Sequence, residues 1–312
     1  MKAFLISHKI LTIMFCLVVL ACALCFLWWQ NNGLVVTHYS FASKKVSTGL
    51  DGFRIVQISD LHNKDYGQRL FSLIETQQPD LIVITGDLID NRSRNIKPTI
   101  DLLEQALRLA PVLYVPGNNE ERSNRYEELV ARLTGIGVTV LENEAVYVTP
   151  NDTGKASLSN RIGINLIGIV DPDFLKNEAG YVEERKESLI KEAIKQNMVA
   201  GENRLTDEKS PAENGMLHVL LAHRPELLEV YAACNVDLVF SGHAHGGQVR
   251  LPFVGGLVAP HQGFFPKYTS GLHVLRNTTM VISRGLGDSI FPLRLFNRPE
   301  LVVVTMKRPA GS

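Results

Sequence analysis

Short apolar runs recur along the chain, and each run ends at glycine or at a polar residue. They occupy 81–85, 111–116, 218–222 and 236–240, whereas at 53–58 the apolar residues Phe53, Ile55 and Ile58 alternate around Val56. Runs of this length, bounded by turn residues, indicate strands that are covered on both faces. Helical patterns at 68–77 and 97–110 separate the first three of these five segments in chain order, and a charged amphipathic pattern at 181–197 indicates a solvated outer helix. Strands that alternate with helices predict an α/β fold.

The longest apolar stretch lies near the amino terminus, where residues 10–29 contain no charge. A helix of this length crosses a hydrocarbon core of about 30 Å. Lys2 and Lys9 precede it, so the positive-inside rule predicts a single-pass protein of the cell membrane, with a cytoplasmic amino terminus and an extracytoplasmic body. A cleaved signal is the alternative, because Ala21–Ala23 resembles a small-residue cleavage site. The continued apolar character of 24–29 favours an uncleaved anchor.

These patterns divide the chain into four parts. We expect an anchor at 1–29, a polar tether at 30–49 that lifts the body off the membrane, a body at 50–308 and a tail at 309–312. The chain has 312 residues, of which 45% are hydrophobic and 21% are charged, so the body can bury one large core.

Charge and cysteine content narrow the functional classes. The net charge is zero, so no global field would recruit nucleic acid, and we expect no nucleic-acid partner. Three of the four cysteines lie inside the apolar amino-terminal stretch, which leaves no disulfide framework for the body. No feature of the sequence indicates a protein partner.

Residues able to bind a metal follow five of the predicted strands. They are Asp60, His62, Asp87, Asn118, His223, His243 and His245. Each of these residues alone is better explained as a helix cap, a turn residue or a half-buried histidine. Together, at the ends of five strands, they are better explained as metal ligands. Carboxylate, amide and imidazole ligands without a thiolate suit Mn, Fe or Zn. Seven side chains are too many for one catalytic ion and about right for two divalent or trivalent ions that share a bridging carboxylate.

The order of these residues resembles that of the calcineurin-like metallophosphoesterases, whose motifs are D-x-H, GD, GN-x-[DE], a single H and GH-x-H. The longer stretches LAHRPE, SGHAHGGQVRLP, SRGLG and FPLRLFNRPE resemble a membrane-associated bacterial branch of phosphodiesterases. Some UDP-2,3-diacylglucosamine pyrophosphatases are similar to that branch. The resemblance extends from Phe53 to Thr305.

This resemblance implies both a ligand set and a fold. One ion would be held by Asp60, His62 and His245, the other by Asn118, His223 and His243, and Asp87 would bridge the two. The implied fold is a four-layer αββα sandwich, in which two mixed β-sheets pack face to face with helices outside, preceded here by one transmembrane helix.

Asn119 departs from the family pattern, because most members carry a histidine there that stabilises the transition state or protonates the leaving group. An amide donates a hydrogen bond but does not deliver a proton at neutral pH. Three interpretations stay open: a substrate with a good leaving group, such as a nucleotide phosphate released from a diphosphate; another proton donor; or a weakened enzyme. We take Asn119, Asp87 and His223 as the catalytic candidates.

Candidate substrate contacts come from residues that flank the motifs. Arg224 follows His223 and Arg250 follows the GHAH turn, so both arginines, together with Asn119, are candidates for phosphate contacts. The two arginines are equally compatible with ordinary surface positions. His261 lies in a glycine- and proline-rich stretch and is an open candidate for the wall of the site.

We therefore predict a membrane-anchored, metal-dependent phosphoric ester hydrolase. Its substrate would be a phosphodiester or a lipid-linked diphosphate, that is, a phosphorylated small molecule or a phospholipid-like compound. A hydroxide that bridges two ions would attack phosphorus directly. Two alternatives remain: a UDP-2,3-diacylglucosamine pyrophosphatase of lipid A synthesis, and a noncatalytic metal-binding membrane protein that keeps the fold.

Overall fold

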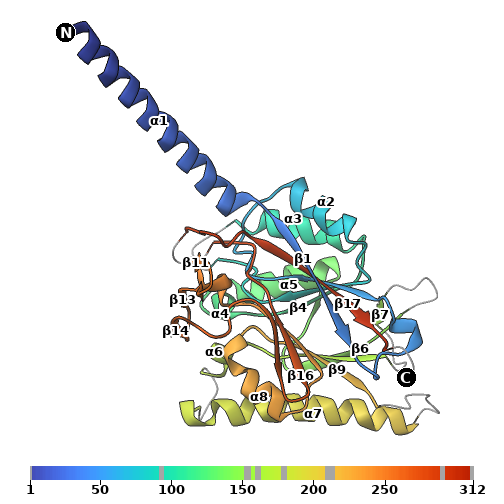
Figure 1. Ribbon diagram of the computed structural model, residues 1–312. Coiled ribbons are helices and arrows are strands. Elements are labelled where there is room, and N and C mark those ends of the chain that lie inside the picture. Colours follow the sequence, from blue (N-terminus) through green and yellow to red (C-terminus); the bar gives the residue numbers. More distant parts are fainter. Residues whose placement is uncertain are drawn as a thin grey trace.

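The computed structural model describes residues 2–90, 95–150, 156–158, 163–176, 181–207, 215–288 and 292–309, and it describes no side chains for 2–7, 156–158 and 202–207. Most of the expected tail at 309–312 therefore lies outside the described residues. Within the described part, two β-sheets pack face to face and helices cover their outer faces (Figure 1).

The first sheet has six strands in the order β1-β17-β2-β3-β4-β5. Their bounds are β1 Val35–Ala42, β17 Glu300–Lys307, β2 Arg54–Ile58, β3 Leu81–Thr85, β4 Val112–Val115 and β5 Thr139–Val140. The strands from β2 to β5 run parallel, whereas β17 is antiparallel to β2. Helices α2 (Gln68–Thr76), α3 (Lys97–Ala106) and α5 (Tyr126–Ile136) pack on its outer face.

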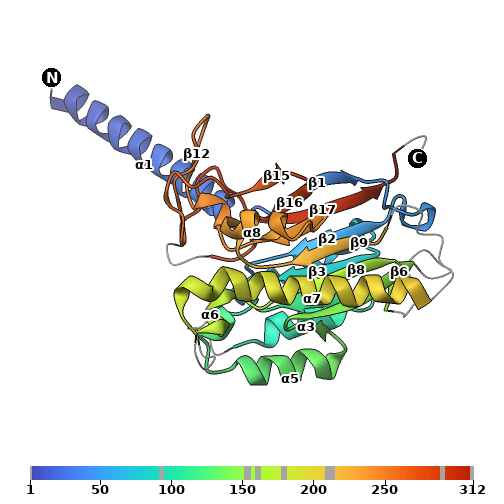
Figure 2. The ribbon, with the colours of Figure 1, turned by 90° about the horizontal axis from the view of Figure 1, so that it is seen from below.

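The second sheet has seven strands in the order β15-β16-β10-β9-β8-β6-β7. Their bounds are β15 Gly271–Leu275, β16 Thr278–Ile282, β10 Leu238–Ser241, β9 Leu217–Leu221, β8 Ile164–Gly168, β6 Glu144–Pro150 and β7 Ala156–Leu158. The central strands β16, β10, β9 and β8 are parallel. Helices α7 (Lys186–Asp207) and α8 (Leu228–Ala233) cover its outer face, visible in Figure 2.

The main core lies between the two sheets. Ile55 of β2 and Val83 of β3 meet Val219 of β9 and Phe240 of β10 there, and all four are fully buried. Val56, the neighbour of Ile55, points instead to the helices outside the first sheet. Burial on both faces explains why these runs lack polar alternation. The expected four-layer αββα sandwich of two mixed sheets is confirmed.

The segment expected to be a polar tether, 30–49, contains strand β1, which pairs in parallel with β17 at the edge of the first sheet. Tyr39 and Phe41 pack towards the inter-sheet core, while Val36 packs on the other face. The part of the expected tether at 35–42 therefore belongs to the folded domain. Polar side chains on an edge strand made the stretch look like a linker, although its apolar residues alternate as in a strand.

Helix α1 (Lys2–Asn32) precedes β1 and projects away from the sheets in both views (Figures 1 and 2). The described residues contain one helix long and apolar enough to cross a membrane, at His8–Asn32, and its most apolar 18 residues have a mean hydropathy of 3.0. Only Gly33 and Leu34 separate α1 from β1.

Two short α-helices, four 3₁₀ helices and two small hairpins complete the described elements. The helices that border the site are α4 (Asn118–Glu121) and α6 (Pro172–Leu175). The hairpins pair β11 (Arg250–Leu251) with β12 (Gly255–Gly256) and β13 (Val258–Ala259) with β14 (Gly263–Phe264), in an excursion between β10 and β15.

Candidate metal centre

Five parallel strands, three from the first sheet and two from the second, bring their carboxyl ends to one edge of the sandwich. β2 and β3 lead into Asp60 and Asp87, and β9 and β10 lead into His223 and His243. β4 leads into Asn118. Because both sheets contribute, ligand-type side chains that are distant in the sequence converge beyond the strand ends, where open α/β sheets place their ligands.

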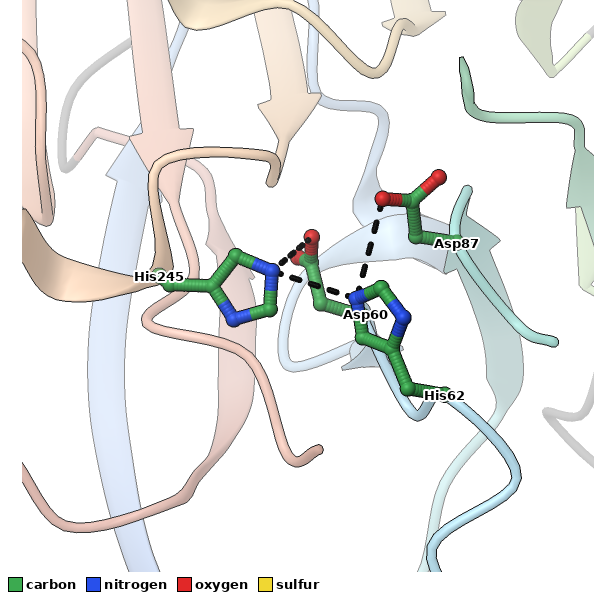
Figure 3. A group of neighbouring side chains, drawn as sticks. All are labelled: Asp60, His62, Asp87 and His245. Carbon is green, nitrogen blue, oxygen red and sulfur yellow. Dashed lines mark hydrogen bonds and ion pairs between the residues drawn. The ribbon is translucent and has the colours of Figure 1, made fainter. Parts of the chain in front are cut away.

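Asp60, His62, Asp87 and His245 form the first group (Figure 3). The Nε2 atoms of His62 and His245 lie 3.1 Å apart. His245 Nε2 lies 3.3 Å from Asp60 Oδ1, and His62 Nε2 lies 3.6 Å from Asp87 Oδ2. One ligand atom from each residue lies within 4.8 Å of the others, which is the arrangement that a single ion requires.

Asp87, His223 and His243 form the second group. His223 Nε2 lies 3.4 Å from Asp87 Oδ2 and 3.1 Å from His243 Nδ1. Asp87 belongs to both groups, so one buried carboxylate lies between two sets of imidazoles. This is the position of a bridging ligand in a two-ion centre.

An unpartnered polar atom tests whether these residues suit metal ions. Among the described side chains, the buried Oδ1 atom of Asn118 has no hydrogen-bond partner. A buried polar atom without a partner is costly unless an ion or another group satisfies it. The Oδ1 atom of Asn118 is a hard oxygen donor of the kind that completes an O/N ligand set. The donor set therefore fits metal ions.

The backbone of the ligand-type residues is strained. Left-handed φ angles occur at Asp60 (48°), His62 (49°), Asp87 (51°), His243 (67°) and His245 (46°). Such a conformation at a residue other than glycine costs of order 1–3 kcal/mol and persists only where the surroundings enforce it. Five of the seven expected ligands share it, so the fold holds these side chains in place at the expense of local stability.

Glycine is required at two positions next to these residues. A Cβ atom on Gly242 would clash with Ser59 Oγ and with Asp60 Oδ2. A Cβ atom on Gly86 would clash with the His223 ring. The motif glycines therefore let the two sheets bring their carboxylate and imidazole side chains together.

Hydrogen bonds fix the orientation of the site. Glu120 accepts bonds from the backbone N–H groups of Asp87, Ile89 and Gly117, at 2.7–2.9 Å. His223 Nδ1 lies 2.7 Å from the Thr85 carbonyl oxygen. A carbonyl only accepts, so Nδ1 donates, and Nε2 is left facing Asp87. These hydrogen bonds orient the Asp87 and His223 side chains before any ion binds.

Burial and neighbouring charges give the aspartate and the histidines of the site different protonation states. The Asp87 carboxyl is fully buried, which opposes its ionisation, but His223 beside it holds the pKa of Asp87 well below its usual range. In turn Asp87 outweighs burial and raises the pKa of His223 to about 10. Burial, reinforced by neighbouring imidazoles, lowers the pKa values of His243 and His245 well below the usual range. Their neutral rings are the form that binds a metal.

Burial also raises two carboxyl pKa values. The pKa of Asp60 is raised chiefly by burial, and that of Glu120 rises to about 8 through burial and the nearby Asp87. The nearby His223 and a hydrogen bond of 2.6 Å from Ser59 Oγ oppose the shift at Asp60. A cation beside Asp60 would favour its ionised form for the same electrostatic reason.

Asn119 contacts Asp87 through both its backbone and its side chain. Its backbone N–H donates to Asp87 Oδ1 at 2.8 Å, and Nδ2 donates to Oδ2 at 2.6 Å. The amide therefore holds the shared carboxylate. The expected contact between Asn119 and a substrate stays a prediction, although the residue does border both groups.

The two arginines expected at the substrate have other partners. Arg224 is buried, and its Nε and Nη2 atoms donate to the two carboxylate oxygens of Asp171 at 2.6 and 2.8 Å. Arg250 donates to the Gly246 carbonyl at 2.8 Å and to Thr269. Both guanidinium groups donate hydrogen bonds within the scaffold, and their phosphate contacts stay a prediction. Sequence proximity to a motif did not show where these long side chains point.

His261 does lie beside the site. Its ring stacks on His243, with centroids 5.4 Å apart and planes inclined by 25°. Burial, together with the nearby Arg224, lowers its pKa. The excursion between β10 and β15 therefore forms part of the wall of the site.

Sequence reasoning gave no role to several residues that orient the site. Asn297 donates to the His245 carbonyl at 2.7 Å, and the buried Arg294 donates to the Gly287 carbonyl at 2.6 Å. Both lie in the FPLRLFNRPE stretch, whose resemblance to the phosphodiesterase branch is the sequence feature that could have indicated them. Glu120 was visible only as the last position of GN-x-[DE].

Two mixed sheets that bring carboxylates and imidazoles to one edge around a shared aspartate define a class of metal-dependent hydrolases. The chain belongs to the calcineurin-like phosphoesterase family, whose pattern matches residues 53–247. It is accordingly a metal-dependent phosphoric ester hydrolase, as the motifs predict.

Three relatives illustrate the family. The chain is 29% identical over 285 residues to the uncharacterized metallophosphoesterase YkuE of Bacillus subtilis, covering 89% of this chain and 87% of that one. It is 28% identical over 265 residues to the phosphodiesterase YaeI of Escherichia coli, covering 81% and 82%. It is 26% identical over 276 residues to the transmembrane protein with metallophosphoesterase domain of Danio rerio, covering 85% and 55%.

Proposed function

We propose that this chain is a membrane-anchored phosphohydrolase with two metal ions, acting on a phosphodiester or a diphosphate. Asp60, His62 and His245 would hold one ion, Asn118, His223 and His243 the other, and Asp87 would bridge them. The observation that carries the proposal is the membership of Asp87 in both groups of ligand-type atoms.

The ions, when bound, would supply Lewis acidity towards the phosphate and a water of lowered pKa. The chain's own residues prepare the site for them. The Thr85 carbonyl selects the tautomer of His223 that presents Nε2, and burial keeps His243 and His245 neutral. Glu120 fixes the backbone at Asp87, Ile89 and Gly117 by accepting hydrogen bonds from their N–H groups.

Asn119 favours a substrate whose leaving group departs without a proton. Its amide is a hydrogen-bond donor held 2.6 Å from Asp87 Oδ2, and it has no titratable proton near neutral pH. A nucleotide phosphate or an aryl oxide is stable enough to leave unassisted, whereas an alkoxide is not. A diphosphate or an activated diester is therefore the favoured substrate class.

Membrane anchoring rests on α1, because the most apolar 18 residues of its His8–Asn32 segment have a mean hydropathy of 3.0 and none of them is buried. A soluble core helix of that character would be covered by the fold. A relative from Danio rerio named as a transmembrane protein agrees with this proposal. By the positive-inside rule, Lys2 and Lys9 support a cytoplasmic amino terminus and a catalytic body on the other side of the membrane.

Asp87→Asn tests the metal centre, because the substitution keeps the shape of the side chain and removes its charge. The full-length protein in detergent should lose at least about tenfold in affinity for Mn²⁺ and in turnover of bis(p-nitrophenyl) phosphate. Asp101→Asn, at an exposed ion pair with Lys97, is the matched control and should change neither.

Full metal content and unchanged turnover in Asp87→Asn would refute the bridging role. Full metal content in the unsubstituted protein, with no turnover of diesters or nucleotide diphosphates, would instead support the noncatalytic alternative.

A further inference from the structure

The carboxyl end of α1 is fastened to the domain. Three side chains of the domain donate to carbonyl groups at the helix end: Lys64 to Asn31 at 2.8 Å, Arg69 to Asn32 at 3.1 Å and Arg298 to Gly33 at 3.0 Å. Cations at this position also complement the negative end of the helix dipole. The helix end is therefore held in a fixed place on the domain surface.

Aromatic contacts continue this attachment one turn further into the apolar segment. The Phe26 ring lies 5.9 Å from the Phe296 ring, and Arg298 lies over the Trp29 ring at 4.6 Å. Gly33 and Leu34, the two residues between α1 and β1, span about 7 Å at most when extended. With so short a junction, the surface around the helix end must lie where the helix leaves a bilayer.

Large exposed aromatic side chains lie in the excursion between β10 and β15 and at Phe296, whose ring contacts α1. Phe253, Phe264, Phe265 and Phe296 have exposed fractions of 109, 80, 69 and 53%. Phe253, Phe265 and Phe296 also have left-handed φ angles of 66°, 53° and 52°. A bulky residue in that conformation is an outlier, and here the strain is combined with exposure instead of being offset by burial. Such a combination indicates that something outside the chain contacts these side chains.

Three of these phenylalanines belong to the excursion that walls the metal centre. Its backbone is tied to the GHAH turn, since Leu257 N–H donates to the Gly247 carbonyl at 3.1 Å and Arg250 donates to the Gly246 carbonyl. From the same excursion, His261 stacks on His243. β11 in Figure 1 and β12 in Figure 2 lie beside the base of α1, and Figure 1 shows α7 on the opposite side of the domain.

We propose that Phe253, Phe264, Phe265 and Phe296 form a membrane-docking surface, which seats the mouth of the metal centre against the bilayer that holds α1. The occupant is a lipid bilayer because the surface continues directly from an apolar helix and its tips are aromatic. The substrate is accordingly an amphiphilic phosphoester, with its apolar part in the bilayer and its phosphate at the headgroup level. This inference rests on the anchoring proposed above.

The test places a fluorescent label at Phe253 or Phe264, the two tips of the docking surface, in the full-length protein. Cys16, Cys22 and Cys25 are replaced by alanine and the buried Cys234 is kept. An environment-sensitive nitrobenzoxadiazole label is attached in Phe253→Cys or Phe264→Cys, and in Val199→Cys on α7 as the exposed control far from α1. The proteins are reconstituted into phosphatidylcholine–phosphatidylglycerol vesicles with or without doxyl-labelled lipid.

Docking predicts a blue-shifted emission and strong quenching by doxyl lipid at both tips, and neither effect at residue 199. Water-like, unquenched emission at both tips, in protein that resists alkaline extraction, would overturn docking and leave anchoring intact. Release by alkali would overturn the anchor and docking with it. A blue shift that depends on protein concentration, without lipid quenching, would assign the surface to a second copy and overturn the bilayer assignment.

A catalytic measurement separates docking from the chemistry. The triple variant Phe253→Ser/Phe264→Ser/Phe265→Ser should cleave the p-nitrophenyl ester of phosphatidic acid in vesicles about tenfold more slowly, because interfacial contact area is lost. Its turnover of soluble bis(p-nitrophenyl) phosphate should stay unchanged, as should both rates in Val199→Ser. Equal loss on both substrates would overturn docking. Absence of turnover in the unsubstituted protein would count against the proposed hydrolase, while the quenching result would still decide docking.

Discussion

The affinity of the metal centre should depend steeply on pH, because His223 must lose a proton before its Nε2 atom can bind an ion. Nδ1 is committed to the Thr85 carbonyl, so the exchangeable proton sits on Nε2, 3.4 Å from Asp87 Oδ2. Asp87 raises the pKa of His223 to about 10. Because this pKa lies about three units above pH 7, the apparent affinity at pH 7 should be on the order of 1000-fold below its high-pH limit.

Calorimetric titration of metal-stripped, full-length protein with Mn²⁺ at pH 6.5–8.5 would measure this dependence. The affinity should rise about tenfold for each pH unit, with about one proton released per ion bound at the His223 group. Buffers of different ionisation enthalpy report that proton count. His38→Asn, at an exposed histidine outside the site, should keep the slope. A flat affinity across this range, or binding without proton release, would refute the reasoning.

The raised pKa of His223 also determines the direction in which the stability of the metal-free protein changes with pH. The pKa of His223 in the folded state lies above its ordinary value of about 6.5, so protonation of His223 stabilises the fold. This stabilisation is complete below a pH of about 6.5. The stabilisation is lost as the pH rises through about 10. The urea midpoint of the metal-free protein should therefore fall between pH 7 and pH 10, whereas excess Mn²⁺ should reduce that fall.

Two further substitutions test the site and its packing. Asn119→His should speed hydrolysis of poor alkyl leaving groups by roughly tenfold or more and leave activated aryl diesters little changed; parallel dependence on leaving-group pKa in both variants would show that residue 119 does not assist departure. Gly242→Ala should lower the free energy of unfolding by about 1–3 kcal/mol because its Cβ would meet Ser59 Oγ. Gly135→Ala, in open space on α5, should be neutral or stabilising by up to about 1 kcal/mol, and urea denaturation compares the two.

Strand ends were the most informative part of the sequence. Runs such as LIVIT and VDLVF read as strands buried on both faces, and they are β3 and β10. Because parallel strands bring their carboxyl ends to one edge, the residues that follow them could be grouped before any geometry was known. Asp60, His62, Asp87, His223, His243 and His245 do lie together.

The sequence did not predict the directions of the side chains or the pairing of the edge strand. Nothing in the pattern shows that Arg224 turns inward to Asp171, or that Asn119 donates to Asp87, because both depend on the path of neighbouring loops. The polar character of Thr37, His38 and Ser40 concealed an edge strand, whose partner β17 lies more than 250 residues away in the chain. Long-range pairing of that kind leaves no local signal.

The two-residue junction between α1 and β1 limits the reach of the enzyme. With α1 in a bilayer, the metal centre stays within one domain's width of its own membrane, and encounters with a lipid-borne substrate occur by lateral diffusion in two dimensions. The quantity that sets the rate is then the mole fraction of substrate in the bilayer. Diluting the substrate with inert lipid, at constant bulk concentration, should slow its hydrolysis, and adding more vesicles of the same composition should not.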